Sequence, residues 1–190
     1  MFRDLVLANR SYRRFDARES IDEQKVRSLV DLARCTPSAA NLQPLKYVIS
    51  CDSQRNATVF STLSWAGYLA DWAGPEEGER PTAYVIVLGD TRIAKSFGCD
   101  QGIAAQTILL GAVERGYGGC IFGSIDRDRL RRELSIEDHL EILLVIALGK
   151  PVETVVLEEV RGEGSIKYFR DEAGVHHVPK RALDEIVLGQ

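Results

Sequence analysis

The chain has 190 residues, of which 45% are hydrophobic and 27% are charged, with a formal net charge of -4. This length suits one domain with a substantial core, so we expect a single domain over residues 1–190. The mildly acidic balance offers no basic surface to a phosphate backbone, so we expect no nucleic-acid partner.

No segment approaches the ~20 consecutive apolar residues of a membrane span, and Arg3 and Arg10 interrupt the N-terminus where a signal peptide would need its apolar core. The four cysteines are widely spaced and form no C-x-x-C pair; they are Cys35, Cys51, Cys99 and Cys120. Such spacing indicates reduced thiols rather than a disulfide framework or a thiolate metal site. We therefore expect a soluble, cytoplasmic protein with no membrane partner and no metal.

The first expected element is a short amphipathic helix at residues 2–9, where apolar side chains recur at helical spacing. The next helix has a clear start signal, because residues 20–23, "SIDE", match a capping box. In that motif Ser20 and Glu23 would each satisfy a free amide at the helix start.

Behind this signal, an apolar stripe at i, i+3, i+4 and i+7 begins at Val26 and predicts a helix with one buried face. Pro37 disfavours helical geometry at the residue before it. The helix should therefore end near Cys35.

Three segments predict strands: an alternating one at 45–51 and two near-continuous apolar runs at 83–90 and 141–150, which suit strands covered on both faces. Between the last two, residues 99–116 are apolar around most of a helix circumference, which predicts a buried central helix, shared with a second subunit. Helices and strands are mixed without strict βαβ alternation. The sequence therefore favours an α+β fold over a doubly wound sheet.

The stretch 10–15, "RSYRRF", is the first candidate site. Arg10, Ser11 and Arg13 lie within four residues, and guanidinium forks match phosphate oxygens while the hydroxyl adds a donor. The alternative is a solvated basic helix end, where arginine complements the helix dipole.

The loop after the second helix, "CTPSAANLQP" at residues 35–44, is the second candidate. Its prolines fix the backbone and its alanines leave the backbone accessible. Asn41 and Gln43 each offer a donor and an acceptor, which suits a planar heterocycle with imide edges. The alternative is a plain helix-to-strand turn.

The glycine-rich stretch "GYGGCIFGS" at 116–124 resembles a dinucleotide fingerprint only loosely. It follows a long helix and precedes a strand-like segment, whereas that fingerprint must follow a strand and open a helix, so we reject this interpretation. The glycines would still let a flat ligand approach the backbone, and a helix C-cap is the alternative for Gly116.

The stretch "GVHHVPKR" at 174–181 places two histidines side by side. In a strand, His176 and His177 would point to opposite faces, which argues against a shared metal. Lys180 and Arg181 are better candidates for phosphate contacts, with solvated charge as the alternative.

The stretch at 63–81 carries both tryptophans of the chain, and Trp65, Tyr68 and Trp72 are spaced by three and four residues. Such a face is more typical of a core. The glycine- and proline-containing tail also suits a mobile flap, so these three residues are candidates for a substrate pocket.

Taken in order, four of these segments resemble the nitroreductase family of flavoproteins. They are "RSYRRF", "PSAANLQP", "DQGIAAQTILLGAVERGYGGCIFG" and "VPKRALDEIV", and together they extend over nearly the whole chain. The resemblance implies an α+β fold with a mixed central sheet flanked by helices. It also implies a homodimer that joins through long central helices and holds FMN at the subunit interface.

The resemblance implies roles for individual residues. Arg10, Ser11 and Arg13 should hold the FMN phosphate with Arg181, helped by Lys180. The residues expected at the flavin ring or ribityl chain are Pro37, Ser38, Ala39, Asn41 and Gln43, with Gly119 and Gly123 approaching the ring through their backbone.

Members of this family take hydride from NADH or NADPH onto flavin N5 and pass electrons to nitroaromatics or quinones in alternating half-reactions. The resemblance thus implies no nicotinamide fingerprint and no side-chain acid or base, because the cofactor carries the chemistry. Reductive dehalogenation and flavin fragmentation are variants within the class. The alternatives from other classes are a flavin-binding or carrier module with little turnover, and a purely structural dimer.

Two departures bear on the electron acceptor. Leu45 stands where many relatives have tryptophan after the glutamine-proline pair, and the compact chain has little room for the helical excursion of larger members. The segment "SWAGYLADW" at 64–72 is therefore the one candidate for a lid.

Overall fold

The computed structural model describes residues 1–69 and 71–189. Its α-helices are α1 (Phe2–Ala8), α2 (Glu23–Arg34), α3 (Ser53–Phe60), α4 (Asp100–Glu114), α5 (Arg127–Leu134) and α6 (Leu183–Ile186), with 3-10 turns η1 (Ala39–Asn41) and η2 (Glu77–Glu79). Its strands are β1 (Leu45–Ser50), β2 (Ala83–Asp90), β3 (Gly118–Phe122), β4 (Leu140–Gly149), β5 (Val155–Val160), β6 (Phe169–Arg170) and β7 (His176–Arg181). Within these described ranges, no helix combines the length and apolarity that crossing a bilayer requires.

A four-stranded sheet in the order β1-β2-β4-β3 forms the centre of the molecule, and all its neighbours pair antiparallel. All eight residues of β2 are buried, as its near-continuous apolar run predicts. In register, Val85 lies between Ile49 of β1 and Ile146 of β4. The strands expected at 45–51, 83–90 and 141–150 are thus confirmed as β1, β2 and β4.

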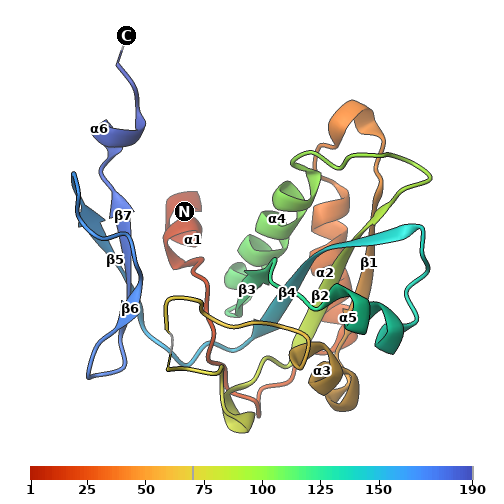
Figure 1. The fold of residues 1–190 in the computed structure, drawn as a ribbon, viewed down its shortest axis with the longest axis horizontal. Coiled ribbons are helices and arrows are strands. Elements are labelled where there is room, and N and C mark those ends of the chain that lie inside the picture. The colour runs from red at the N-terminus through yellow and green to blue at the C-terminus, as the bar shows by residue number, and fades with distance from the viewer. Residues whose placement is uncertain (70, 190) are drawn as a thin grey trace.

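The two faces of this sheet are covered by different helices (Figure 1). Val85 and Val87 of β2 pack with α2 and α4, whereas Ile86 and Leu88 pack with Val59 of α3 and with α5. The alternation follows from the two-residue period of a strand. With the neighbouring structures described below, this mixture of helices and sheets confirms the α+β class.

The C-terminal part forms a second sheet in the order β5-β7-β6, in which β5 and β7 pair parallel and β6 and β7 antiparallel. Figure 1 shows this sheet beside α1, at the opposite end of the molecule from α3 and α5. That residues 1–190 form a single domain stays a prediction.

The start of α2 differs from the expectation. Its N-cap is Asp22, whose carboxylate accepts the backbone N–H of Lys25 at 2.8 Å, and Ser20 is exposed outside the helix. The capping box predicted at Ser20 is therefore wrong, because an aspartate two residues later satisfies the free amide. The end of α2 at Arg34, with Cys35 as C-cap, is as predicted.

The central helix α4 is only partly buried by its own chain. Ala104, Ala105 and Ile108 are inaccessible, but Ile103 and Leu110 remain half-buried. Complete burial, as expected from its apolar circumference, is thus not reached within one chain, which leaves apolar surface for another contact.

Candidate functional site

The N-terminal arginine segment lies along the edge of β3. Ser11 and Gly119 form an isolated parallel bridge, and the N–H of Tyr12 donates to the carbonyl of Gly119 at 3.0 Å. A Cβ at Gly119 would collide with the carbonyl oxygen of Ala147 and lie 2.7 Å from the Leu109 side chain. Glycine is therefore needed at this position to keep the close packing of the strands and α4 on which the arginine segment lies.

A cavity of about 330 Å³ opens between this segment, α4, β3 and β7. We call it the cationic cavity, because three cations line it and, among the described residues, no carboxylate does. Its polar lining includes Arg10, Ser11, Arg13, Lys180, Tyr168 and His176.

The alternation of β7 decides which basic residue enters the cavity. His176, Val178 and Lys180 line it from one face of the strand. Arg181 follows on the other face, where its guanidinium lies 3.9 Å from the carboxylate of Glu185. In this chain, Lys180 therefore joins the arginine segment and Arg181 does not, although the resemblance gives Arg181 the larger role.

The two arginines of the segment that line the cavity, Arg10 and Arg13, are held by carbonyls, whereas the third, Arg14, pairs with the Glu79 carboxylate. Arg10 Nη2 donates to the carbonyl of Val6 at 2.8 Å, and its Nε is buried without a partner among the described residues. Arg13 Nη1 lies 3.3 Å from the carbonyl of Ser11, and its guanidinium lies 4.8 Å from the ring centre of Tyr168. Both positive charges thus remain available to an anion in the cavity.

His176 is a buried hydrogen-bond partner of Arg13. It is 1% exposed, and its Nε2 lies 3.3 Å from Arg13 Nη1, an arrangement in which the guanidinium donates and the neutral imidazole accepts. Burial first, and then the charges of Arg13 and Arg170, lower the pKa of His176 from 6.5 to about 4. His176 is therefore neutral at pH 7 and adds no charge to the cavity. Sequence reasoning gave His176 no role beyond an argument against metal.

Glu153 is a second residue that sequence reasoning missed. Its carboxylate is 1% exposed and accepts the backbone N–H groups of Arg13 and, at 3.2 Å, of Arg14. It also accepts from Arg170 Nη2 at 3.2 Å. Glu153 therefore fixes the backbone that carries Arg13. No local sequence pattern indicates this contact, because the two residues are 140 positions apart.

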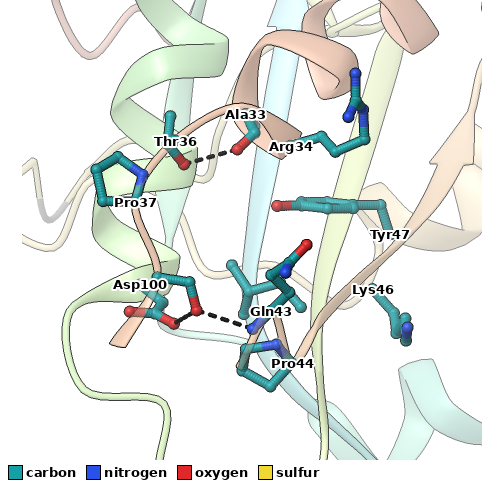
Figure 2. A pocket seen from close by; sticks show the side chains of 11 residues that line it. Ala33, Arg34, Thr36, Pro37, Gln43, Pro44, Lys46, Tyr47 and Asp100 are labelled. Carbon is teal, nitrogen blue, oxygen red and sulfur yellow. Dashed lines mark hydrogen bonds between the residues drawn. The ribbon is translucent and has the colours of Figure 1, made fainter. Parts of the chain in front are cut away.

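The loop at 37–43 lines a different cavity, of about 220 Å³, between the end of α2, β1 and the start of α4. We call it the loop cavity; Figure 2 shows it with Asp100 on one side and Tyr47 of β1 on the other. Ala40, Asn41 and Gln43 have φ of 50°, 54° and 52°, in the left-handed region. Three such residues without glycine within four positions indicate strain, which persists only where other contacts impose it.

Asp100 supplies those contacts. This residue, 4% exposed at the first turn of α4, accepts the hydroxyl of Ser38 at 2.7 Å and the N–H of Ala39 at 3.1 Å. The Ser38 hydroxyl in turn accepts the N–H of Gln43 at 3.0 Å. Asp100 thus ties the loop to α4, and the sequence analysis did not single it out.

The two cavities lie at different points along α4. Asp100 lines the loop cavity, whereas Gln106 and Leu109 line the cationic cavity. Six residues of helix correspond to about 9 Å. Among the residues described, the two cavities share no lining residue, so one chain does not bring the arginine segment and the 37–43 loop together into a single site.

Trp65 belongs to the core rather than to a lid. The segment around it forms turns and no helix within the part described, so its helical spacing does not reflect a helix. The Trp65 ring packs edge-on against Phe122 of β3, with centroids 4.6 Å apart, and against Phe60 of α3 at 5.4 Å. Trp65 therefore joins the face of the sheet covered by α3 and α5.

Tyr68 and Trp72 instead contact the C-terminal segment. The Tyr68 ring lies 4.9 Å from that of Tyr168, which lines the cationic cavity, and Tyr68 is 51% exposed. The guanidinium of Arg170 lies 4.8 Å from the Trp72 ring. Of the three aromatic candidates, Tyr68 comes nearest to the cavity, and a role for any of them with substrate stays a prediction.

The other sequence candidates lie apart from the two cavities. A Cβ at Gly123 would meet open space, so packing does not require glycine there. His177 points away from His176 and contacts Glu158 at 2.5 Å and Asp171 at 3.1 Å. Over residues 1–69 and 71–189, no three His, Cys, Asp or Glu side chains converge as metal ligands do.

Comparisons with known proteins agree on one family. The family model described as "Nitroreductase family" matches residues 6–150. A protein of Methanothermobacter thermautotrophicus named "Putative NADH dehydrogenase/NAD(P)H nitroreductase" is 28% identical over 157 residues, covering 79% of this chain and 77% of its own.

Solved structures show the same fold. A nitroreductase family protein from Streptococcus pneumoniae TIGR4 has a TM-score of 0.72 at 19% identity and full coverage of both chains. The structure of "a putative nitroreductase in complex with FMN" from Exiguobacterium sibiricum 255-15 has a TM-score of 0.66 at 18% identity, covering 80% of this chain and 89% of its own.

Proposed function

Because this chain belongs to the nitroreductase family of oxidoreductases, we propose that it is an FMN-dependent enzyme that carries reducing equivalents from NADH or NADPH to nitroaromatic or quinone-type acceptors. The family match covers residues 6–150, and one structural neighbour is described as a complex with FMN. When bound, FMN would supply the redox chemistry, taking up and releasing electrons in alternating half-reactions.

The cationic cavity is the observation that carries this proposal. Arg10, Arg13 and Lys180 give it three positive charges, and no described carboxylate lines it. The buried Nε of Arg10 has no partner in the described chain, so a donor is left for an acceptor from outside. A phosphate group fits this donor set, because its oxygens match the guanidinium fork and the serine hydroxyl of Ser11.

The strained 37–43 loop would border the flavin ring. Its exposed Asn41 and Gln43 side chains offer donors and acceptors to the polar edge of a flavin, and Pro37, Ser38 and Ala39 would provide the surface against which the ring lies. Gly119 of β3 and Gly123, which follows that strand, would approach it through their backbone.

We further propose that two copies of the chain assemble around the flavin. The apolar side chains of α1 are uncovered in one chain, with Phe2 70% and Leu7 43% exposed, and Ile103 and Leu110 of α4 are half-buried. A second subunit would cover this surface and could bring its 37–43 loop to the cationic cavity of the first. Light scattering of the purified protein tests the dimer directly.

FMN titration tests the assignment of the cavity. Arg10→Ala and Arg13→Ala should each weaken FMN binding about 10- to 100-fold, because each removes a charge-assisted contact worth about 1.5–3 kcal/mol. Lys95→Ala is the matched control, since among the described residues the ammonium of this exposed lysine hydrogen-bonds only to the carbonyl of Thr91. Wild-type affinity in both arginine variants would contradict the assignment.

Stopped-flow absorbance separates the enzyme from a flavin carrier. The enzyme predicts rapid bleaching of bound FMN by NADH or NADPH, followed by reoxidation with a nitroaromatic compound. A carrier module predicts tight FMN binding with neither step.

A further inference from the structure

A third cavity lies on the side of the central sheet covered by α3. It has a volume of about 370 Å³ and lies between α3, η2 and the start of β2. Among the residues described, it shares no lining residue with the cationic cavity or the loop cavity. We call it the distal cavity.

Two polar groups in the distal cavity lack partners. Tyr84 is 0% exposed, and its hydroxyl has no hydrogen-bond partner in the described part of the chain. The Nε of Arg80 is likewise buried and unpartnered there. Both residues line the distal cavity.

Leaving such groups unsatisfied is costly. A buried hydroxyl without a partner costs about 1–3 kcal/mol, so phenylalanine would serve the core better than tyrosine at position 84 if nothing bound there. The other buried polar groups at this cavity are satisfied, because Asn56 accepts from Ser50 at 2.8 Å and donates to the carbonyl of Thr82 at 2.8 Å. Among the described residues that line the distal cavity, the buried donors left without a partner are thus the Tyr84 hydroxyl and Arg80 Nε.

The surroundings limit the charge and shape of what fits. The Arg80 guanidinium is stacked 4.3 Å from the centre of the Phe60 ring, and Ala57 and Pro81 add apolar wall. Glu77 also lines the cavity, so the side-chain charges of its lining nearly cancel, which disfavours a multiply charged anion such as phosphate. The donors suit one carboxylate, and the walls suit a flat apolar body.

We propose that the distal cavity is a binding site for a small aromatic or similarly flat monocarboxylate. Its carboxylate accepts from Arg80 and from the Tyr84 hydroxyl, and its apolar body lies against Ala57 and Pro81. This site is separate from the flavin site, and its test does not depend on FMN.

Calorimetric titration of the purified protein with benzoate tests this proposal. We expect saturable binding of benzoate, and much weaker binding of benzamide, which has the same shape without the charge. Tyr84→Phe and Arg80→Gln should each weaken benzoate binding about tenfold or more, because each removes a donor to a charged group.

Matched controls are available on the same chain. Tyr117→Phe removes a tyrosine hydroxyl whose only described contact is Lys25, 3.4 Å away, and Arg132→Gln removes an exposed arginine of α5. Neither control should change benzoate affinity. The flavin absorbance of FMN-loaded protein should also stay unchanged on benzoate addition, since a ligand stacked on the flavin would alter it.

A thermal readout covers the case in which a variant is hard to titrate. Without ligand, Tyr84→Phe should raise the melting temperature, and benzoate should raise the melting temperature of the wild type more than that of the variant. Three results would overturn the proposal: no benzoate binding up to about 10 mM, equal affinity in wild type and both variants, or preferential binding of inorganic phosphate.

Discussion

The hydrogen bonds of Ser38 offer the sharpest test of how the 37–43 loop is held. Ser38 Oγ donates to the buried Asp100 carboxylate at 2.7 Å and accepts the N–H of Gln43 at 3.0 Å. A bond to a charged group contributes about 1.5–3 kcal/mol and a neutral one about 0.5–1.5 kcal/mol. Because the loop is partly exposed, Ser38→Ala should lower the free energy of unfolding by about 2 kcal/mol, near the lower end of their sum.

Urea denaturation measures this loss, and for a chain of this size it corresponds to a fall in melting temperature of about 4–8 °C. Ser28→Ala is the control, because in the described part of the chain the Ser28 hydroxyl hydrogen-bonds only to the Lys25 carbonyl within α2. Alanine is a better helix former than serine, so this control should lose no stability.

A double-mutant cycle with Asp100→Asn tests the cause. If Ser38 acts through the carboxylate, Ser38→Ala should lower the free energy of unfolding less in the Asp100→Asn background than in the wild type. The difference between the two losses should be at least about 1 kcal/mol. The reasoning is refuted if Ser38→Ala stays within about 0.5 kcal/mol of wild type, or if the two losses simply add.

Three further predictions concern the cationic cavity. The pKa of His176 is lowered from 6.5 to about 4, so between these pH values the unfolded chain binds a proton that the folded chain does not. The free energy of unfolding should therefore fall as the pH drops from 6.5 toward 4. Urea denaturation of His176→Gln should show a flatter pH dependence than that of the wild type. Glu153→Gln weakens a buried ion pair with Arg170 and the hydrogen bond that holds the Arg13 backbone. Urea denaturation should show a loss of about 3 kcal/mol in the free energy of unfolding, and titration should show weaker FMN binding. Gly119→Ala should lose about 1–3 kcal/mol because its Cβ meets packed backbone, whereas Gly123→Ala should be neutral because its Cβ meets open space; equal melting curves would contradict this.

The central sheet and the main helices could be predicted because their signals are local. The apolar run at 83–90 requires cover on both faces, and the structure gives all of β2 that cover. The end of α2 follows from Pro37, whose ring restricts the residue before it. These features depend on a few neighbouring residues, which the sequence displays directly.

The features that the sequence did not predict depend on contacts between distant segments or on competing local signals. Asp100 and Glu153 act on residues more than sixty positions away, so no spacing rule identifies them. At the start of α2, Ser20 and Asp22 both suit an N-cap, and in the structure Asp22 takes that position. The spacing of Trp65 satisfied a helical pattern, yet its ring is held by β3 and α3 across a turn.

The sequence of β7 contains two pairs of neighbouring residues with similar side chains, which bears on its register against β5. The strand reads His176-His177 and then Lys180-Arg181, two doublets of like residues four positions apart. A slip of one position against β5 moves every side chain to the other face. In one direction it would bring His177 and Arg181 to the places of His176 and Lys180, and in the other it would bring Val175 and Pro179 there. The doublets therefore preserve the cavity lining for a slip in one direction only, and even that slip would lose the contacts of His177 with Glu158 and Asp171.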